Sequence, residues 1–346
     1  MPDNPNAITR LRLENFTAFR ELDIRFSPGL NVLIGENGTG KTHVLHVLHS
    51  AVAVTRLGER RRLAVKLCSV FMPYEGRLGR LVRRQQGSST ASVLVSRADS
   101  GYIRFSFTNH AKEPGEHAAK QRRWFDRAVT SAFIPVKEIL ANAPGFRSLY
   151  AERVVHFEET YADILDRAYI PVPRGAPSKA RQQLMRALEK HMQGKVKVKD
   201  ESFFLRSRSG DLEFSLLAEG LRKLALLWTL INNGTLLEGA ILFWDEPEAN
   251  LNPSVIGAVV EVILELQRMG VQVFIATHSY VVLRELDLRL KPGDSVRFHA
   301  LFRDKESGDV KCSSTDDPDL VEPNAILDTF GDLYNRAVKR ALGGNG

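Results

Sequence analysis

A short glycine-rich segment constrains the fold of this chain more than any other feature. Residues 35–42 read GENGTGKT. They follow residues 31–34, NVLI, which are typical of a short buried strand, and they precede residues 42–54, which have the apolar spacing of a helix. Strand, glycine loop and helix in this order predict a phosphate-binding loop, in which backbone N–H groups surround an anion at the start of the helix.

The spacing assigns a role to each position of this loop. Four residues are expected to turn backbone N–H groups toward the phosphates of ATP, namely Asn37, Gly38, Thr39 and Gly40. Lys41 is expected to reach the β- and γ-phosphates, and the Thr42 hydroxyl to bind Mg²⁺. A chance match in a protein without nucleotide is the alternative, and the flanking strand and helix argue against it. ATP and Mg²⁺ are therefore the expected cofactors.

An acidic pair follows a second apolar strand. Residues 240–244 are apolar and lead directly into Asp245 and Glu246. Because the carboxyl ends of strands in a parallel sheet face the ligand, both carboxylates are expected at the same edge as the glycine loop. Asp245 is expected to hold Mg²⁺ or one of its waters. Glu246 is expected to orient and deprotonate the attacking water as the catalytic base.

A histidine follows a third apolar strand. Residues 276–279 read ATHS after the mainly apolar residues 271–275, VQVFI. A single histidine after a strand is more often structural than catalytic. Its position after the glycine loop and the acidic pair reverses that preference. We therefore expect His278 to contact the γ-phosphate and Glu246.

These motifs resemble, in order, those of ABC-type ATPases. The likeness includes residues 248–253, which read EANLNP directly after Asp245, Glu246 and Pro247. Residues 11–16, LRLENF, and the run through residues 31–38 resemble the start of SMC, RecF and OLD-type ATPases. The resemblance covers residues 7–55 and 210–300. It implies ATP hydrolysis without a membrane domain, and action on DNA or in anti-phage defence, as in stand-alone bacterial ATPases of the OLD-like group.

The signature motif of that superfamily departs from its usual form here. The resemblance places Ala218 where a serine normally caps the γ-phosphate of the opposite subunit's nucleotide, while Gly220 remains. Lys223 or Arg222 is expected to compensate for the lost hydroxyl. Because such heads share their sites between two subunits, the resemblance implies an ATP-dependent homodimer. The usual lobe-bridging glutamine also has no clear counterpart: Gln85 and Gln86 fit by residue type, and residues 134–138, IPVKE, fit better by position.

The element pattern predicts an α/β fold, a two-lobe ABC ATPase head with a mostly parallel sheet around the phosphate loop, a β-rich lobe and a helical insertion. We expect residues 1–57 and 210–346 to form the two halves of the ATPase core. Residues 58–209 are expected to form an insertion with a hairpin near residues 92–107 and helices at residues 118–130 and 179–192.

The charge distribution points to a polyanion. The net charge is +7, yet the stretch from Arg56 to Arg127 contains 16 Lys and Arg against 6 Asp and Glu. Such an excess favours non-specific DNA binding through phosphates, although a solvated basic face without a partner is the other interpretation. The candidate contacts are arginines of this stretch: Arg60–Arg62, Arg77, Arg80, Arg83, Arg84, Arg122 and Arg123.

Other sequence features argue against a membrane protein, a histidine metal site and a nuclease domain. No apolar stretch of about 18 residues occurs, and the two cysteines, Cys68 and Cys312, are far apart, which together predict a cytoplasmic protein without membrane contact. His43, His46 and His49 recur every third residue, for which packing is favoured over a metal site. The few acidic residues after His278 do not make a nuclease, so any effector would be encoded separately.

The sequence therefore predicts an ATP-driven, DNA-associated switch subunit, working with a separate effector in bacterial anti-phage defence. The main alternative is a protein-binding regulator that holds or releases a toxin or nuclease according to its nucleotide state, without DNA contact. A transporter ATPase subunit is disfavoured by the basic stretch and the weak signature motif.

Overall fold

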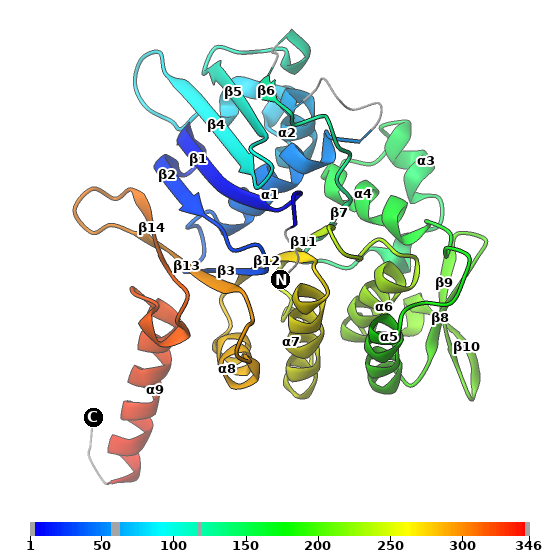
Figure 1. Cartoon of the computed structure of the whole chain (residues 1–346). Helices are drawn as coiled ribbons and strands as arrows, with labels where there is room; N and C mark the ends of the chain where they lie inside the picture. Colours follow the sequence, from blue (N-terminus) through cyan, green and yellow to red (C-terminus); the bar gives the residue numbers. More distant parts are fainter. Residues whose placement is uncertain (1–3, 57–62, 117–118, 343–346) are drawn as a thin grey trace.

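A six-stranded sheet forms the centre of the computed structural model, which describes residues 4–56, 63–116 and 119–342 (Figure 1). Its strands run in the order β14 (Val310–Thr315), β13 (Val296–Arg303), β3 (Leu30–Ile34), β12 (Gln272–Thr277), β11 (Ile241–Asp245) and β7 (Ser131–Ile134). All neighbouring pairs are parallel except β13 and β14, which form the antiparallel hairpin at one edge. This is the mostly parallel sheet expected from the sequence.

A five-stranded antiparallel sheet lies on the upper side of the molecule in Figure 1. Its strand order is β2 (Phe19–Arg25), β1 (Ile8–Phe16), β4 (Thr90–Arg97), β5 (Tyr102–Thr108) and β6 (Lys120–Arg122). The hairpin expected near residues 92–107 is present as β4 and β5, and β4 pairs with β1 along most of its length. The expected insertion therefore contributes strands to both large sheets: β4 and β5 belong to the five-stranded sheet, and β7 belongs to the six-stranded sheet.

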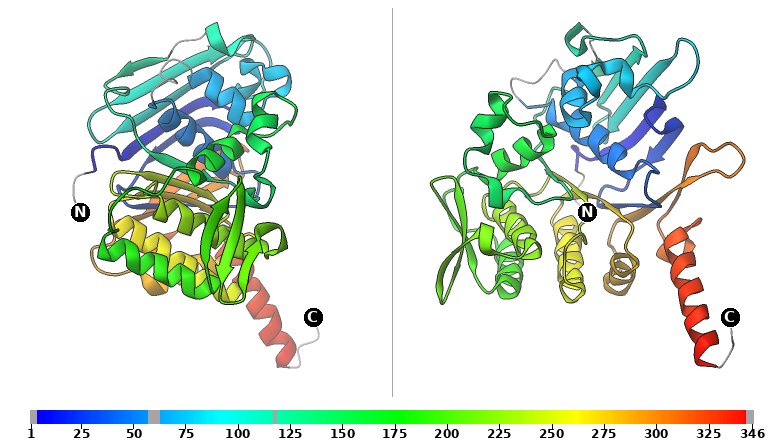
Figure 2. Two further views of the ribbon diagram at one scale, coloured as in Figure 1. Left: turned by 90° about the vertical axis from the view of Figure 1, so that its right-hand side faces the viewer. Right: turned by 180° about the vertical axis from the view of Figure 1, so that it is seen from behind.

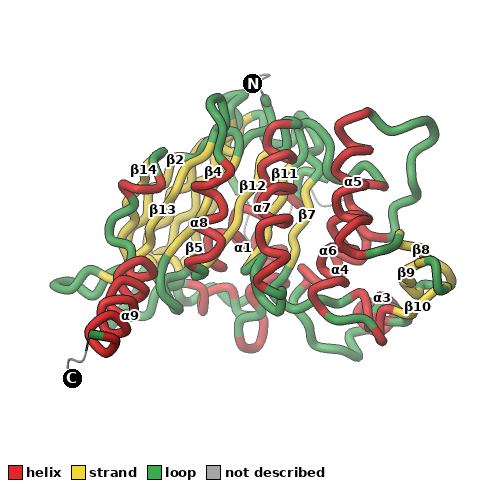
Figure 3. Tube along the Cα trace, turned by 90° about the horizontal axis from the view of Figure 1, so that it is seen from below, coloured by secondary structure: helices red, strands yellow, loops and turns green. Residues whose placement is uncertain are grey.

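Helices cover both faces of the central sheet. The first, α1 (Lys41–Ala53), lies between the two large sheets, with α2 (Leu63–Phe71) beside it. The opposite face carries α6 (Glu219–Asn232), α7 (Pro253–Arg268) and α8 (Tyr280–Arg289), and α5 (Lys179–Met192) packs against α6 and α7 (Figures 2 and 3). At the flank lie α3 (Phe146–Ala151), α4 (Glu159–Ala168) and a small sheet of β8 (Lys195–Lys199), β9 (Ser202–Ser207) and β10 (Gly210–Glu213). The last helix, α9 (Ala325–Ala341), projects from the body.

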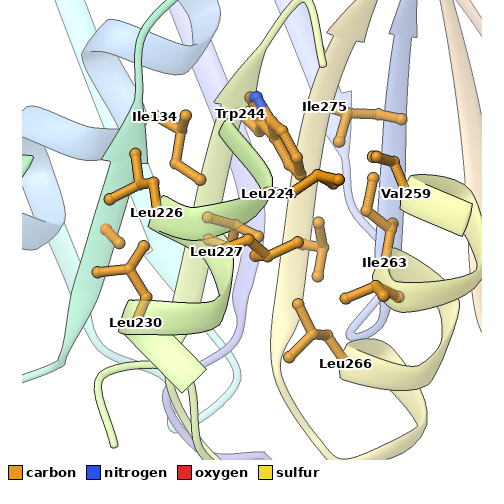
Figure 4. Packing of buried hydrophobic residues seen from close by; sticks show 14 of the residues in the cluster. Ile134, Leu224, Leu226, Leu227, Leu230, Trp244, Val259, Ile263, Leu266 and Ile275 are labelled. Atoms are coloured by element: carbon orange, nitrogen blue, oxygen red, sulfur yellow. The ribbon is translucent and has the colours of Figure 1, made fainter. Parts of the chain in front are cut away.

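Alternating side chains of β11 divide the core into two layers. Ile241 and Phe243 belong to the cluster around α1, whereas Trp244 packs with residues of α6 and α7, including Leu224 and Ile263 (Figure 4). A strand buried on both faces must be apolar at every position, which explains its uninterrupted apolar sequence. Packing on both faces of β11 thereby fixes the position of Asp245, the last residue of this strand.

The helix expected at residues 118–130 is absent from the described residues 119–130. This segment instead contains the short strand β6 followed by turns, and the Trp124 indole N–H donates a hydrogen bond to the Ala51 carbonyl at 2.8 Å. Arg97 stacks over the same indole. The tertiary position of one aromatic side chain thus overrides the weak helical spacing of the segment. The helix expected at residues 179–192 is present as α5.

Candidate nucleotide-binding site

Three sequence motifs meet at one edge of the central sheet. Asp245, at the end of β11, pairs with Ala276 of β12, and Thr277 pairs with Ile34 at the end of β3. Because these strands are parallel, their carboxyl ends open on the same side, where α1 begins. The structure therefore brings together the glycine loop, the acidic pair and the histidine segment.

Glycine is required at two positions of the loop. A Cβ atom on Gly40, whose φ is 89°, would lie 2.5 Å from Cζ of Phe19. A Cβ atom on Gly35, whose φ is 149°, would lie 2.2 Å from the carbonyl oxygen of Leu301. Between them, Asn37 and Gly38 are exposed. The loop is thus held tightly at its ends and is open where phosphates would be bound.

Two side chains of the loop, those of Lys41 and Thr39, donate hydrogen bonds to the loop's own carbonyl oxygens. The buried Lys41 ammonium donates hydrogen bonds to the carbonyl oxygens of Gly35 at 2.7 Å and Glu36 at 3.0 Å. Burial lowers the pKa of Lys41, against the opposing effect of the nearby carboxylates. Thr39 is also buried, and its hydroxyl donates to the Glu36 carbonyl at 2.8 Å. This arrangement places a cation inside the curve of the loop, where it can reach an anion.

The Thr42 hydroxyl and the Asp245 carboxylate lie side by side. Oγ1 of Thr42 donates to Oδ2 of Asp245 over 2.8 Å. Burial raises the pKa of Asp245 to about 6, because the charged carboxylate has little access to water. A hydroxyl and a carboxylate at one point are hard oxygen ligands that fit Mg²⁺. A bound cation would also offset the cost of burying the charge of Asp245.

Glu246, the residue after Asp245, pairs with His278. Nδ1 of His278 lies 3.1 Å from Oε1 of Glu246, and both side chains are partly exposed. Glu246 has a positive φ of 46°, and its N–H donates to the Ala276 carbonyl at 2.9 Å. Positive φ at a residue other than glycine is unfavourable and is often found at functional sites. Here it turns the Glu246 side chain out of the strand direction and toward His278.

Glu248 has a role that the sequence analysis did not assign. Its Oε1 accepts hydrogen bonds from the Thr277 hydroxyl at 2.7 Å and from the His278 N–H at 3.2 Å. This carboxylate therefore fixes the backbone that carries His278. The motif containing Glu248 was recognised, but a contact between two segments about 30 residues apart is not encoded in local spacing.

The segment expected to act as a signature motif lies at the start of α6. Ala218 is the N-cap residue, is exposed and provides no side-chain cap. A Cβ atom on Gly220 would lie 3.1 Å from the Asn250 carbonyl oxygen, so α6 packs closely on the turn that follows β11. The first turn of α6 thus presents free backbone N–H groups at the surface, which is where an anion is favoured.

Two cations of α6 are already engaged within the chain. Lys223 is only 1% exposed, and its ammonium donates to the Ala249 carbonyl at 2.7 Å. Arg222 forms an ion pair with Glu138 at 2.6 Å and donates to the Leu217 carbonyl. Contact of either residue with a partner's nucleotide stays a prediction, and it would require these bonds to break.

Glu138 is the last residue of the segment, residues 134–138, that fits a lobe-bridging residue by position, and this role stays a prediction. Ile134 at the end of β7 pairs with Trp244 of β11, and the Glu138 N–H donates to the Glu219 carboxylate of α6 at 3.4 Å. An ion pair between Glu138 and Arg222 also connects this segment to α6. Gln85 and Gln86 lie in an exposed segment before β4.

Arg303, at the end of β13, was not anticipated. Its guanidinium donates to the Gly38 carbonyl at 3.1 Å and to the Gly308 carbonyl at 3.3 Å. The exposed middle of the glycine loop is thereby linked to the β13–β14 hairpin. An arginine some 265 residues from Gly38 offers no sequence signal for this contact.

The three histidines of α1 serve packing within the described structure. His46 is buried, which lowers its pKa to about 3, and its ring packs against Phe133. His49 lies 2.8 Å from Asp163, which also accepts from Lys66. Among residues 4–56, 63–116 and 119–342, no group of three or more His, Cys, Asp and Glu side chains is placed to hold a metal ion. The packing interpretation fits this arrangement.

The basic stretch divides into engaged and accessible side chains. Lys66 and Arg97 are buried, and Arg83 forms an ion pair with Asp309 at 2.6 Å. By contrast, Arg104 and Lys120 lie on the outer face of the five-stranded sheet. With Tyr102, Leu94 and Ser96 they line a shallow hollow of about 250 Å³. Arg60–Arg62 lie outside the described residues.

Comparison with known proteins identifies a family for this chain. A family model described as "AAA domain, putative AbiEii toxin, Type IV TA system" matches residues 86–284, more than half of the chain. The chain belongs to this AAA-domain family. A second model, described as "AAA domain", matches residues 10–134 and includes the glycine loop. No helix in the described part of the chain is both long and apolar enough to cross a bilayer.

Curated relatives and solved structures extend the comparison. The chain is 30% identical over 146 residues to the DNA replication and repair protein RecF of Streptococcus suis, covering 42% of this chain and 37% of the relative. It is 33% identical over 90 residues to RecF of Halalkalibacterium halodurans, covering 26% and 23%. The chain thus matches well under half the length of these relatives.

Among solved structures, an Smc head bound to the C-terminal winged-helix domain of ScpA matches with a TM-score of 0.54 and 12% identity. That match covers 89% of this chain and 97% of the other. A Pyrococcus furiosus Smc head bound to the C-terminal domain of ScpA matches with a TM-score of 0.50 and 10% identity, covering 96% and 100%. The two-lobe α/β head and the expected resemblance to SMC- and RecF-type ATPases are confirmed.

Proposed function

We propose that this chain is a Mg²⁺-dependent ATPase that converts ATP and water to ADP and phosphate. One observation carries the proposal: the glycine loop, the Thr42–Asp245 contact at 2.8 Å and the Glu246–His278 pair at 3.1 Å converge on one sheet edge. A structural role for any one of these groups would leave their convergence unexplained. Membership of an AAA-domain family supports nucleotide binding at this edge.

Each group then has one task. The N–H groups of the loop and the Lys41 ammonium bind the phosphates, and Thr42 and Asp245 would hold Mg²⁺, which neutralises phosphate charge when bound. Glu246 accepts a proton from the attacking water, because it is a partly exposed carboxylate next to the γ-phosphate position. His278 orients Glu246 and contacts the γ-phosphate. Glu248 and Arg303 hold the histidine segment and the loop in place.

Substitution of Glu246 tests the proposal. Glu246→Gln keeps the shape of the side chain but cannot accept the proton, so ATP binding should persist while turnover falls by roughly 10²–10⁴-fold. Glu261→Gln is the matched control, since Glu261 lies exposed on α7. Turnover is measured as phosphate release and binding by titration with a fluorescent ATP analogue. Parent-level turnover in the Glu246 variant would show that the base lies elsewhere.

We infer that two copies close around two ATP molecules, each site completed by the partner's α6. The exposed N-terminus of α6 at Ala218 supports this. A helix N-terminus favours an anion, and no contact between this end of α6 and the nucleotide of its own chain is proposed, so it could bind the γ-phosphate held by a second copy. Leu216 beside it is 69% exposed and would add apolar area to a contact at this end of α6. Such a dimer would be two-fold symmetric and dependent on nucleotide.

We further propose that the dimer is a DNA-associated switch in the cytoplasm. The relatives named DNA replication and repair proteins support this role, as do the exposed cations of the Arg56–Arg127 stretch, Arg104 and Lys120 among them. Contacts would follow the phosphate backbone and not the base sequence. In this role a separately encoded effector, within a bacterial anti-phage system, would respond to the nucleotide state.

A protein-binding regulator without DNA contact is the second candidate. The family description, with its putative toxin and toxin–antitoxin system, favours this role. The engagement of Lys66, Arg83 and Arg97 within the protein favours it too, because these cations are not free for phosphates. Gel-shift titration at low salt separates the two: retarded DNA supports the first candidate, and unretarded DNA with intact ATPase activity supports the second.

A further inference from the structure

The five-stranded sheet has one face against the core and one face toward solvent. Along β4 and β5 every second side chain is buried, and the side chains between them point outward. Most of the outward side chains on these two strands are serines and threonines. Leu94 on β4 and Tyr102 on β5 are the apolar and aromatic exceptions, and both are only partly buried.

These two exceptions lie next to each other on the outer face. Leu94 pairs with Arg104 and Ser96 pairs with Tyr102, so the leucine and the tyrosine are diagonal neighbours across the two strands. Arg104 pairs in turn with Lys120 of β6. All five side chains line the hollow of about 250 Å³. The hollow therefore combines an aromatic ring and an aliphatic side chain with two cations.

The charge on the outer face is unevenly distributed between the strands. On β1 and β2 the arginines are neutralised within the sheet, Arg10 by Asp23, and Arg12 by Glu14 and Glu21. By contrast, β4, β5 and β6 contain no Asp or Glu. Among the described residues, no acidic side chain forms an ion pair with Arg104 or Lys120. The side of the sheet that contains the hollow is therefore the side that attracts a polyanion.

We propose that this hollow binds one base of a single-stranded nucleic acid, while Arg104 and Lys120 bind the phosphates on either side of that base. The proposal rests on the DNA association proposed above and specifies the form of nucleic acid. The base stacks on the Tyr102 ring, beside Leu94. Because every base has a flat aromatic face, stacking accepts any base and reads no sequence.

The hollow favours a single strand over a duplex for two reasons. In a duplex each base is paired and stacked, so a protein surface reaches only the phosphates and the edges of bases in the grooves. An unpaired base can leave its neighbours at little cost and enter a recess. The volume of the hollow also lies just below the range of about 300–1,000 Å³ that is typical of pockets for drug-sized ligands, so it suits a smaller group such as one base.

Fluorescence anisotropy with a labelled oligothymidine strand and the full chain, without nucleotide, tests the site. Tyr102→Thr should weaken binding roughly tenfold, since one base loses its stacking partner, whereas Tyr102→Phe should keep the parent affinity. Threonine is well tolerated in strands, so the sheet should be kept. Because Tyr102→Thr removes no charge, the slope of log affinity against log salt should stay that of the parent. Binding of a duplex should not change.

Tyr74→Thr is the matched control. Tyr74 belongs to the same basic stretch, is 69% exposed and has Arg80 over its ring, but it lies outside the hollow. This variant should bind oligothymidine as the parent does. Thermal unfolding and binding of an ATP analogue verify that each variant is folded.

The outcomes separate this site from the proposed function. Unchanged oligothymidine affinity in folded Tyr102→Thr would overturn the stacking site, as would an equal loss in Tyr74→Thr or an equal loss of duplex binding in Tyr102→Thr. In each of these cases the protein still binds DNA, so the DNA-associated role stands. A parent that binds neither oligothymidine nor duplex at low salt would overturn both the site and that role. None of these measurements depends on ATP hydrolysis.

Discussion

Glu248 illustrates how a residue outside the chemistry can control it. Its carboxylate accepts from the Thr277 hydroxyl and the His278 N–H, so it sets where His278 meets Glu246. We expect Glu248→Ala to lower kcat by roughly tenfold with little change in ATP affinity, because the histidine segment loses its anchor. Glu248→Gln should retain most activity, since the amide oxygen still accepts both hydrogen bonds. Steady-state kinetics with ATP titration distinguishes the two variants.

The buried carboxylate of Asp245 makes stability depend on pH. Its pKa is raised to about 6 by burial, above the ordinary value of 3.8. Between these values the folded state binds more protons than the unfolded state, so this group's contribution to stability falls as pH rises toward and past 6. We expect Asp245→Asn to raise the free energy of unfolding of the nucleotide-free protein by ~1–3 kcal/mol at pH 7.

The gain from Asp245→Asn should shrink toward pH 4, where the parent carboxyl is already protonated. Urea unfolding without Mg²⁺, repeated at several pH values, measures it. Thr42→Val is a useful companion, because it removes the hydrogen bond to Asp245 without removing the carboxylate. A gain that does not vary with pH would contradict the assignment to Asp245.

At the scale of single elements, α6 contains the expected departure from the ABC-type ATPases that the sequence resembles. The resemblance predicts a signature helix without its serine, which stays a prediction; the structure has Ala218 at the N-cap of α6 without a side-chain cap. We expect Ala218→Ser, made in a Glu246→Gln background, to strengthen ATP-dependent dimerisation. The hydroxyl would add one hydrogen bond to a charged phosphate, worth about 1.5–3 kcal/mol. Sedimentation with and without ATP measures the change.

Ala218→Ser should also stabilise α6 in the absence of ATP, and this effect must be measured separately from dimerisation. A serine at an N-cap stabilises its helix by about 0.5–2 kcal/mol even without a ligand. Thermal unfolding of the nucleotide-free variant should therefore show a small gain. Stabilisation without stronger dimerisation would mean that Ala218 caps a helix only and takes no part in a shared site.

Sequence periodicity predicted the elements that carry the site, because each is locally specified. The glycine loop, β11 with Asp245 and the segment of His278 all follow from apolar runs and fixed spacing. The segment around Trp124 was wrongly predicted as a helix, since its structure depends on a tertiary hydrogen bond to Ala51. Contacts such as Arg303 to Gly38 and Arg222 to Glu138 could not be predicted, because they join distant parts of the chain.

At the scale of the whole molecule, the charge of the β-rich lobe can be tested without disturbing the fold. Arg104 and Lys120 are exposed on the outer face of the five-stranded sheet, where no described side chain neutralises them through an ion pair. Lys195 and Lys199 are also exposed, but on the small sheet at the flank. Serine substitution of either pair lowers the net charge by the same amount. The two double variants thus separate a local surface from the general field of a basic protein.

We expect Arg104→Ser/Lys120→Ser to weaken DNA binding more than Lys195→Ser/Lys199→Ser does. Each lost phosphate contact should reduce the slope of log affinity against log salt by about 0.9, so the first variant should bind with a visibly flatter salt dependence. Fluorescence anisotropy with one duplex at several salt concentrations measures both quantities. Because phosphate contacts carry no base information, a duplex of unrelated sequence should give the same result. Equal weakening by both variants would mean that the protein attracts DNA only through its overall charge, and the outer face of the five-stranded sheet would then have no special part in binding.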